Sequence, residues 1–338
     1  MYKLRNWIDQ DKLDWSYLSL NPYASDLLEK NQDKINWFWL SKNSSAIYLL
    51  EKNIDNINLI NLLNDQDKIN LKYLSLYSNT INLLENKINF EYLSENPSAI
   101  FLLEKKFNKI NWKYLSRNPN AIGLLEKNFS KINWKYLSHN PNAISLLEKN
   151  KDKIDWKLLS GNPNAISLLE KNQDKICWIT LSLNPNAIVL LEKNQDKIHW
   201  ELLSGNLNAI EFLQKNIDKI NWKFLSRNPN AICLLQQNLD KINWSYLSGN
   251  SNAIELLEKN MDKIDWYYLS ENPNAIDILK NNKNKINWNN LSKNLNIFEI
   301  DYDYLRDRLK NSFGEELMMN RFHLQNFEKW ADWGFDIF

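Results

Sequence analysis

The sequence predicts an all-α solenoid, an array of short helix pairs with a 22-residue repeat. Tryptophan recurs every 22 residues from Trp112 to Trp288 without a break, after a shorter series that begins at Trp15. Within each unit, apolar residues recur at helical spacing, and asparagine and proline stand where helices begin. A fixed period of this length is typical of stacked repeats, in which each unit packs only against its neighbours.

Counted from its tryptophan, the unit reads W-x-Y-L-S-x-N-P-N-A-I-x-L-L-E-K-N-x-D-K-I-N. Asn or Asp at position 22 precedes the tryptophan, and Asn at position 7 precedes a proline, so both are expected to cap helices. Proline suits the first turn of a helix, because an N–H group has no partner there. In the unit of Trp112, this predicts one short helix after Asn111 and a second after Asn118, closing at Asn128 in the left-handed conformation.

The spacing of apolar residues predicts which faces of these helices are buried. On the second helix of this unit, one face carries Ala121, Ile122, Leu125 and Phe129. On the first helix, Trp112 shares a face with Leu115. We therefore expect the tryptophans to belong to the core rather than to a platform on which nucleic-acid bases stack.

The repeats divide the chain into three parts. Residues 1–14 are predicted to form an N-terminal cap, residues 15–295 the solenoid, and residues 296–338 a non-repeat helical C-terminal cap. Two units are truncated between residues 59 and 89, where Leu59 and Leu71 take the place of the tryptophan. Caps are expected because the terminal unit of a solenoid would otherwise expose its core. The aromatic C-terminal segment also fits an alternative role, as a docking motif for a partner.

Composition and charge narrow the range of functions. The chain has 42 Lys and Arg residues and 41 Asp and Glu residues, so it lacks the basic excess of a dedicated nucleic-acid or membrane-surface protein. No apolar stretch has the length of a signal peptide at the N-terminus or of a membrane span elsewhere. Cys177 and Cys233 occupy different places in the repeat, which indicates a reducing compartment rather than a disulfide framework. We therefore expect a cytoplasmic protein.

No residue pattern in the sequence indicates catalysis, a cofactor or a metal. His139, His199 and His323 lack metal-ligand spacing with each other and with the two cysteines. The acidic residues recur in every unit, whereas an active site needs one distinct place. No glycine-rich phosphate-binding loop is present. The prediction is a non-enzymatic protein with no cofactor and no metal site.

Positions 2, 6 and 12 of the unit vary most, and helical geometry places all three on exposed faces. A constant frame with variable exposed residues is typical of binding arrays, although exposed positions also vary where nothing constrains them. In three successive units, positions 2 and 6 form a predicted basic stripe, which consists of Lys113, Arg117, Lys135, His139 and Lys157. This stripe is the candidate partner-binding ridge, because it suits an acidic partner or phosphates. The alternative is a solvated charged face.

The phrase LSxNPNAIxLLEKNxDKIxW resembles the repeat arrays of functionally unassigned proteins in large DNA viruses of the mimivirus group. Those arrays often close with a segment similar to FHP…N…KF…WGF. The matching residues here are Phe322, His323, Asn326, Phe327, Trp333, Gly334 and Phe335, and Leu324 replaces the proline. The resemblance covers nearly the whole chain. It implies a giant-virus protein that is made in the host cytoplasm or carried in the virion, and it implies no activity.

Together these observations favour a non-enzymatic scaffold for protein–protein interaction, either a viral structural protein or a host-interaction factor. The alternative is a nucleic-acid-binding superhelix that uses the basic stripe on residues 112–157. Because charges of both signs alternate along most of the unit, we expect no strong binding to nucleic acid. The expected partner is a protein, and no membrane association is expected.

Overall fold

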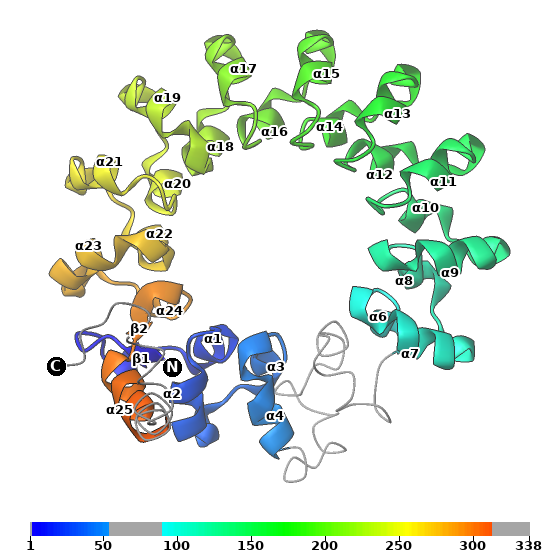
Figure 1. The fold of residues 1–338 in the computed structure, drawn as a ribbon. Coiled ribbons are helices and arrows are strands. Elements are labelled where there is room, and N and C mark those ends of the chain that lie inside the picture. The colour runs from blue at the N-terminus through cyan, green and yellow to red at the C-terminus, as the bar shows by residue number, and fades with distance from the viewer. Residues whose placement is uncertain (1, 54–89, 313–338) are drawn as a thin grey trace, which may run out of the picture.

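The computed structural model describes residues 2–53 and 90–312, and these form the predicted all-α solenoid (Figure 1). The truncated units predicted at 59–89 and most of the predicted C-terminal cap lie outside the described residues. Each described unit except the last contributes one α-helix on the inside of a curved array and one on its outside (Figure 1). The units follow a ring, so that the first unit lies beside the last (Figure 1).

The inner helices begin at the tryptophan, or at Phe90 in one unit, and in most units the residue before the tryptophan caps the first turn. The side chain of Asn111, for example, accepts hydrogen bonds from the backbone N–H groups of Lys113 (3.2 Å) and Tyr114 (3.4 Å). The inner helices are α1 (Trp15–Leu20), α3 (Trp37–Leu40), α6 (Phe90–Leu93), α8 (Trp112–Leu115), α10 (Trp134–Leu137), α12 (Trp156–Ser160), α14 (Trp178–Leu181), α16 (Trp200–Ser204), α18 (Trp222–Arg227), α20 (Trp244–Ser248), α22 (Trp266–Glu271) and α24 (Trp288–Leu291).

The outer helices mostly begin at the isoleucine of position 11 and end near the lysine of position 16. They are α2 (Ser25–Lys30), α4 (Ile47–Asn53), α7 (Ile100–Lys105), α9 (Ile122–Lys127), α11 (Ile144–Glu148), α13 (Ile166–Glu170), α15 (Ile188–Glu192), α17 (Ile210–Gln214), α19 (Ile232–Gln236), α21 (Ile254–Glu258) and α23 (Ile276–Asn281). A longer helix, α25 (Tyr302–Ser312), follows the last unit.

Short 3₁₀ helices flank the outer helices. Those before the outer helix, or in its place in the last unit, are η3 (Ser44–Ala46), η6 (Pro97–Ala99), η8 (Pro119–Ala121), η14 (Pro229–Ala231), η17 (Pro273–Ala275) and η19 (Leu295–Ile297). Those at the end of a unit are η1 (Gln10–Lys12), η2 (Gln32–Lys34), η7 (Phe107–Lys109), η9 (Phe129–Lys131), η10 (Lys151–Lys153), η11 (Gln173–Lys175), η12 (Gln195–Lys197), η13 (Ile217–Lys219), η15 (Leu239–Lys241), η16 (Met261–Lys263) and η18 (Lys283–Lys285).

These 3₁₀ segments correct two details of the sequence prediction. Phe129 does not share the buried face of the outer helix; it begins η9 and is 42% exposed. Asn128 closes α9 without the left-handed conformation, since its φ is −127° and its ψ is 47°. Its side chain instead donates a hydrogen bond to the carbonyl oxygen of Leu124 at 2.9 Å. The amide thus satisfies one of the carbonyl groups left open at the helix end.

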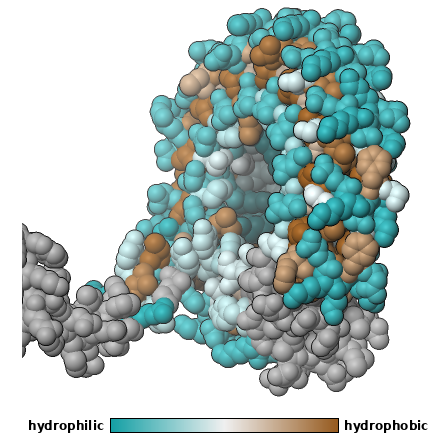
Figure 2. Space-filling model, turned by 45° about the vertical axis from the view of Figure 1, so that its right-hand side comes forward, coloured by the Kyte–Doolittle hydropathy of each residue, from teal (hydrophilic) through white to brown (hydrophobic). Residues whose placement is uncertain are grey.

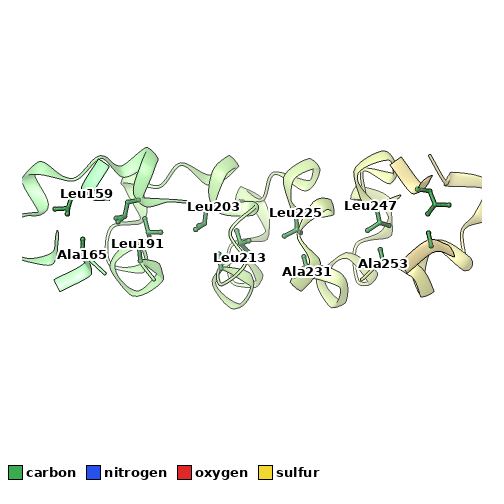
Figure 3. Packing of buried hydrophobic residues seen from close by; sticks show 14 of the residues in the cluster. Leu159, Ala165, Leu191, Leu203, Leu213, Leu225, Ala231, Leu247 and Ala253 are labelled. Carbon is green, nitrogen blue, oxygen red and sulfur yellow. The ribbon is translucent and has the colours of Figure 1, made fainter. Parts of the chain in front are cut away.

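The core is a column of leucine and alanine side chains that runs through the described units, and Figure 3 shows part of it. In the unit of Trp200, the fully buried apolar residues are Leu203, Ala209 and Leu213. Burying each leucine contributes about 1.5–3 kcal/mol, so short helices that would not persist alone in water are stabilised by packing between units.

Buried polar side chains join each unit to the one before it, which explains why serine and asparagine recur so strictly. Asn118 is fully buried, and its amide donates to the carbonyl oxygens of Ser94 (3.1 Å) and Asn96 (2.8 Å) in the preceding unit. The hydroxyl of Ser94 donates to the carbonyl of Phe90 at 2.7 Å and accepts from the N–H of Asn111 at 2.9 Å. These bonds satisfy backbone groups that the ends of short helices leave open.

The tryptophans pack against the core but are half-buried rather than enclosed. The exposed side of the ring is covered by the lysine at position 20 of the same unit. Lys131 Nζ, for example, lies 4.8 Å from the ring centroid of Trp112. Such a cation–π contact at a partly exposed ring contributes about 0.5–1 kcal/mol. The column of tryptophans is therefore the outer layer of the core, as its position beside the leucines predicts.

The N-terminal residues complete the last repeat. The unit that begins at Trp288 has an inner helix and η19, but it continues into a short strand instead of an outer helix. The end of a unit is found at residues 9–15, where the sequence DQDKLDW matches NQDKINW at residues 31–37. Residues 10–12 form η1, the 3₁₀ helix that ends other units. One repeat is thus divided between the two ends of the chain.

Contacts at this junction reproduce those between neighbouring units. The N–H of Asp14 donates to Ser292 Oγ at 2.8 Å, and the equivalent bonds elsewhere measure 2.9–3.1 Å. Lys12 Nζ lies 5.1 Å from the ring centroid of Trp288, while the equivalent lysines lie 4.7–5.1 Å from their tryptophans. The first unit therefore stacks on the last as any unit stacks on its neighbour.

A two-stranded sheet and an ion pair reinforce the junction. Strand β1 (Tyr2–Leu4) pairs antiparallel with β2 (Phe298–Ile300), in a register that sets Lys3 opposite Glu299. Arg5 Nη1 lies 3.1 Å from Glu299 Oε2, and Arg5 Nε donates to the carbonyl oxygen of Asn296 at 2.8 Å. Because the chain between the first and last units is covalently continuous, this junction makes the protein a closed ring.

Candidate binding face on the inner helices

The inner helices present one face of each unit toward the opening of the ring. Positions 1, 4 and 5 of the unit pack against the core, so helical geometry places positions 2, 3 and 6 on the opposite side. In Figure 1 these helices line the opening, and the space-filling view shows the hollow that they surround (Figure 2). Position 12 lies on the outer helices. The variable positions therefore belong to two separate surfaces.

The structure gathers the predicted basic stripe on three consecutive inner helices. Lys113 and Arg117 lie on α8 and the turn after it, Lys135 and His139 on α10 and its turn, and Lys157 on α12. All five side chains are exposed. Their alignment follows from the stacking of units in a constant register.

Contacts with neighbouring side chains change the charge of this stripe in two places, Arg117 and His139. Arg117 Nε lies 3.4 Å from Glu95 Oε1, which belongs to the preceding unit. Burial, together with the positive charge of Arg117, lowers the pKa of the His139 imidazole, so this side chain is neutral at neutral pH. A hydrogen bond with Tyr136 raises the pKa of Lys113, whose Nζ lies 5.2 Å from the Tyr136 ring centroid. The stripe thus retains three lysine charges and one paired arginine.

A row of aromatic side chains runs beside the stripe, and the sequence reasoning did not single it out. It occupies position 3 of the unit. The ring centroids of Tyr92 and Tyr114 are 5.4 Å apart, and those of Tyr114 and Tyr136 are 6.2 Å apart. These are distances of direct contact between aromatic rings. The signal was present in the sequence, because tyrosine recurs at a position that the helical wheel assigns to the exposed face.

The histidines and cysteines are dispersed in the part of the chain that the structure describes. His199 caps α16, since its Nδ1 accepts from the N–H of Leu202 at 3.4 Å. Cys177 takes the equivalent capping position before α14 but makes no capping bond to the backbone. Among residues 2–53 and 90–312, no group of three His, Cys, Asp or Glu side chains could hold a metal ion. His323 lies outside the described residues.

No helix in the described ranges is long and apolar enough to cross a membrane. Comparison of the chain with known protein families, curated proteins and solved structures finds no match. The inner face, with its basic stripe and aromatic row, is therefore the candidate binding site of the protein.

Proposed function

We propose that the protein is a non-enzymatic, ring-shaped scaffold that binds a partner protein on the inner face of its solenoid. The observation that carries this proposal is the combination of the aromatic row of Tyr92, Tyr114 and Tyr136 with exposed Lys and Arg side chains on a concave surface. Repeat proteins commonly use the concave side of the array for binding. Tyrosine, tryptophan and arginine are also the residues that most often dominate the energy of protein interfaces.

The same geometry weighs against the alternative of a nucleic-acid-binding superhelix. Neighbouring rings of the aromatic row contact each other, so a base cannot enter between them without separating the units. Arg117 is already paired with Glu95. Five phosphate contacts would be needed for a salt slope of about −4 on duplex DNA, and the stripe retains fewer free charges. We therefore expect only weak non-specific binding, with a Kd on the order of 10⁻⁴ M at physiological salt.

The resemblance of the repeat to giant-virus arrays supports a further part of the proposal. We propose that the chain is a viral protein that acts in the host cytoplasm or in the virion, as a structural component or a host-interaction factor. The proposal includes no cofactor and no catalytic residue.

Affinity capture from the cells that make the protein tests the proposed face, with two variants of equal charge change. The inner variant is Lys113→Glu/Lys135→Glu/Lys157→Glu. The outer control is Lys127→Glu/Lys149→Glu/Lys171→Glu, in the same three units and also exposed. The expected result is a partner that is retained by the wild type and the outer control and lost by the inner variant. Loss of the partner in the outer control alone would assign binding to the opposite face.

A further inference from the structure

Two units of the ring carry nearly identical inner helices. Residues 112–122 read WKYLSRNPNAI and residues 222–232 read WKFLSRNPNAI. In both units, the lysine at position 2 lies over the tyrosine of the next unit: Lys113 Nζ and Lys223 Nζ are each 5.2 Å from a ring centroid. Position 6 is Arg117 in the first unit and Arg227 in the second. The surroundings of these two arginines differ.

Arg117 already holds a carboxylate. Glu95, at position 6 of the preceding unit, lies 3.4 Å from the guanidinium. His139 occupies position 6 of the following unit, close enough for the charge of Arg117 to contribute to its lowered pKa. The arginine therefore has a side chain on each side, and its anionic partner comes from the same chain.

Arg227 has glycine at both of these places, Gly205 in the preceding unit and Gly249 in the following one. No carboxylate in the described part of the chain forms an ion pair with Arg227. Glu271 lines the same cavity as Arg227, and it pairs with Lys293 at 3.8 Å. Arg227 thus occupies the same position in its unit as Arg117, but among the described residues it has no ion-pair partner equivalent to Glu95.

Neither glycine is required by the backbone or by packing. Gly205 has φ −88° and ψ −8°, and Gly249 has φ −84° and ψ −6°, values that any residue adopts. A Cβ atom at Gly205 would lie no closer than 3.5 Å to another atom, and one at Gly249 no closer than 3.7 Å. Both are ordinary contact distances. Gly249 therefore leaves space beside Arg227 on the side of the following unit, and Gly205 leaves Arg227 without the acidic neighbour that Glu95 is to Arg117.

Gly249 lines a cavity of about 370 Å³ between α18, α20 and α22. Arg227 lines it together with Tyr246 and Tyr268, whose rings stack with centroids 5.9 Å apart and planes inclined by 22°. Lys223 lies over Tyr246 and adds a second positive charge nearby. Glu271 also lines the cavity and is paired with Lys293, so the cavity holds one ion-paired carboxylate and, beside the two aromatic walls, a guanidinium that forms no ion pair with the described residues.

We propose that this cavity binds the carboxylate of a glutamate side chain from the partner protein, which would pair with Arg227 as Glu95 pairs with Arg117. This inference rests on the proposed function, because it names the chemistry of the segment that the inner face binds. Arginine and carboxylate form charge-assisted hydrogen bonds that are stronger than neutral ones. The aromatic walls suit the methylene groups of the same side chain.

The chain has six arginines, so their Nε–Hε signals can be resolved by NMR in selectively labelled full-length protein. The probe is N-acetyl-glutamate methylamide, and its matched control is N-acetyl-glutamine methylamide. The expected result is a saturable shift of the Arg227 signal with the glutamate probe only, while the Arg117 signal stays in place. An Arg227 signal that does not move, or moves equally with the glutamine probe, overturns the inference. An equal or larger response to inorganic phosphate would overturn the choice of a carboxylate.

Gly205→Glu provides an internal test, because it places at Arg227 the acid that Arg117 has. The variant should shift the Arg227 signal without any probe and weaken binding of the glutamate probe by roughly tenfold or more. Gly205→Gln, of the same size, should weaken binding much less. Equal weakening by both variants would mean that the side chain only fills space, which contradicts an ionic site. These tests can fail while the inner-face variant still loses its protein partner. That outcome would support the scaffold function and contradict the carboxylate site at Arg227.

Discussion

At the scale of single residues, the asparagine at position 7 does more than cap a turn. Asn184 is buried, donates to the carbonyl oxygens of Ser160 (3.1 Å) and Asn162 (3.0 Å), and accepts from the N–H of Asn186 at 3.0 Å. One side chain therefore serves two units at once. Because each carbonyl would otherwise be buried without this donor, the residue cannot vary as an ordinary surface cap could.

Replacing Asn184 by alanine should lower the free energy of unfolding by about 2–4 kcal/mol, through the lost cap, the lost bond to Asn162 and the unsatisfied carbonyl of Ser160. Asn186→Ala is the matched control. Asn186 is exposed, and its side-chain amide donates to the carbonyl oxygen of Pro163 at 3.0 Å. Its loss should cost less than about 1 kcal/mol. Urea denaturation of both variants measures the difference, and equal losses would contradict the role given to the buried amide.

The tryptophans allow a second test at this scale. Trp178 packs against the core and is half-buried, so Trp178→Ala should destabilise the protein by about 3 kcal/mol, at the lower end for such truncations. Lys197→Ala removes the ammonium that lies 4.8 Å from the same ring centroid and should cost about 0.5–1 kcal/mol. A thermal melt that is unchanged in Trp178→Ala would show that the ring is not part of the core.

At the scale of helices, one unit lacks its cap. The side chain of Asn133 accepts from the N–H of Tyr136 at 3.2 Å before α10, whereas Cys177 makes no such bond before α14. Cys177→Asn should therefore stabilise the protein by about 0.5–1.5 kcal/mol. Cys177→Ala serves as the control and should give no comparable gain. A lower melting temperature for Cys177→Asn would mean that the contact of Cys177 with Thr180 is worth more than a cap.

The inner and outer helices could be predicted from the sequence because their signals are local. Asn111 and Asn118 mark where the backbone changes direction, and both act as caps. The 3₁₀ helix at Phe129 was missed, because helical spacing continues through it and only the amide of Asn128 ends the α-helix. At the candidate site, the exposure of Lys113 and its neighbours could also be predicted. The pairing of Arg117 with Glu95 could not, since it depends on the register between units.

At the scale of the whole molecule, closure into a ring should depend on the ends of the chain. Arg5→Glu would place a second carboxylate beside Glu299, in a pair that is about one-third exposed. The junction should lose about 1 kcal/mol. Hydrogen exchange should then become faster in α24 and η1 than in α16. Adding Glu299→Arg should restore the exchange rates. If the rates do not recover in the double variant, the ion pair does not stabilise the junction.

The ring itself was not predicted, although the sequence contains its signal. Residues 9–14 end a unit that has no beginning, and the unit of Trp288 begins but has no helical second half. Read separately, each fragment indicates a cap. Only the curvature of the array brings them together, and curvature is the sum of small rotations between units that no local pattern specifies.

The distance between spin labels at Asp11 and Asn289 tests this closure most directly. These exposed residues occupy positions 19 and 2 of the divided unit, and Asp218 and Glu201 occupy the same positions in the unit of Trp200. Labels would be attached to introduced cysteines after Cys177→Asn and Cys233→Ser remove the native thiols. If the ring is closed, both pairs give the same narrow distribution of distances, although 278 residues separate one pair and 17 the other. A broad distribution at long distances for Asp11 and Asn289, beside a narrow one for the control pair, would show that the solenoid is open.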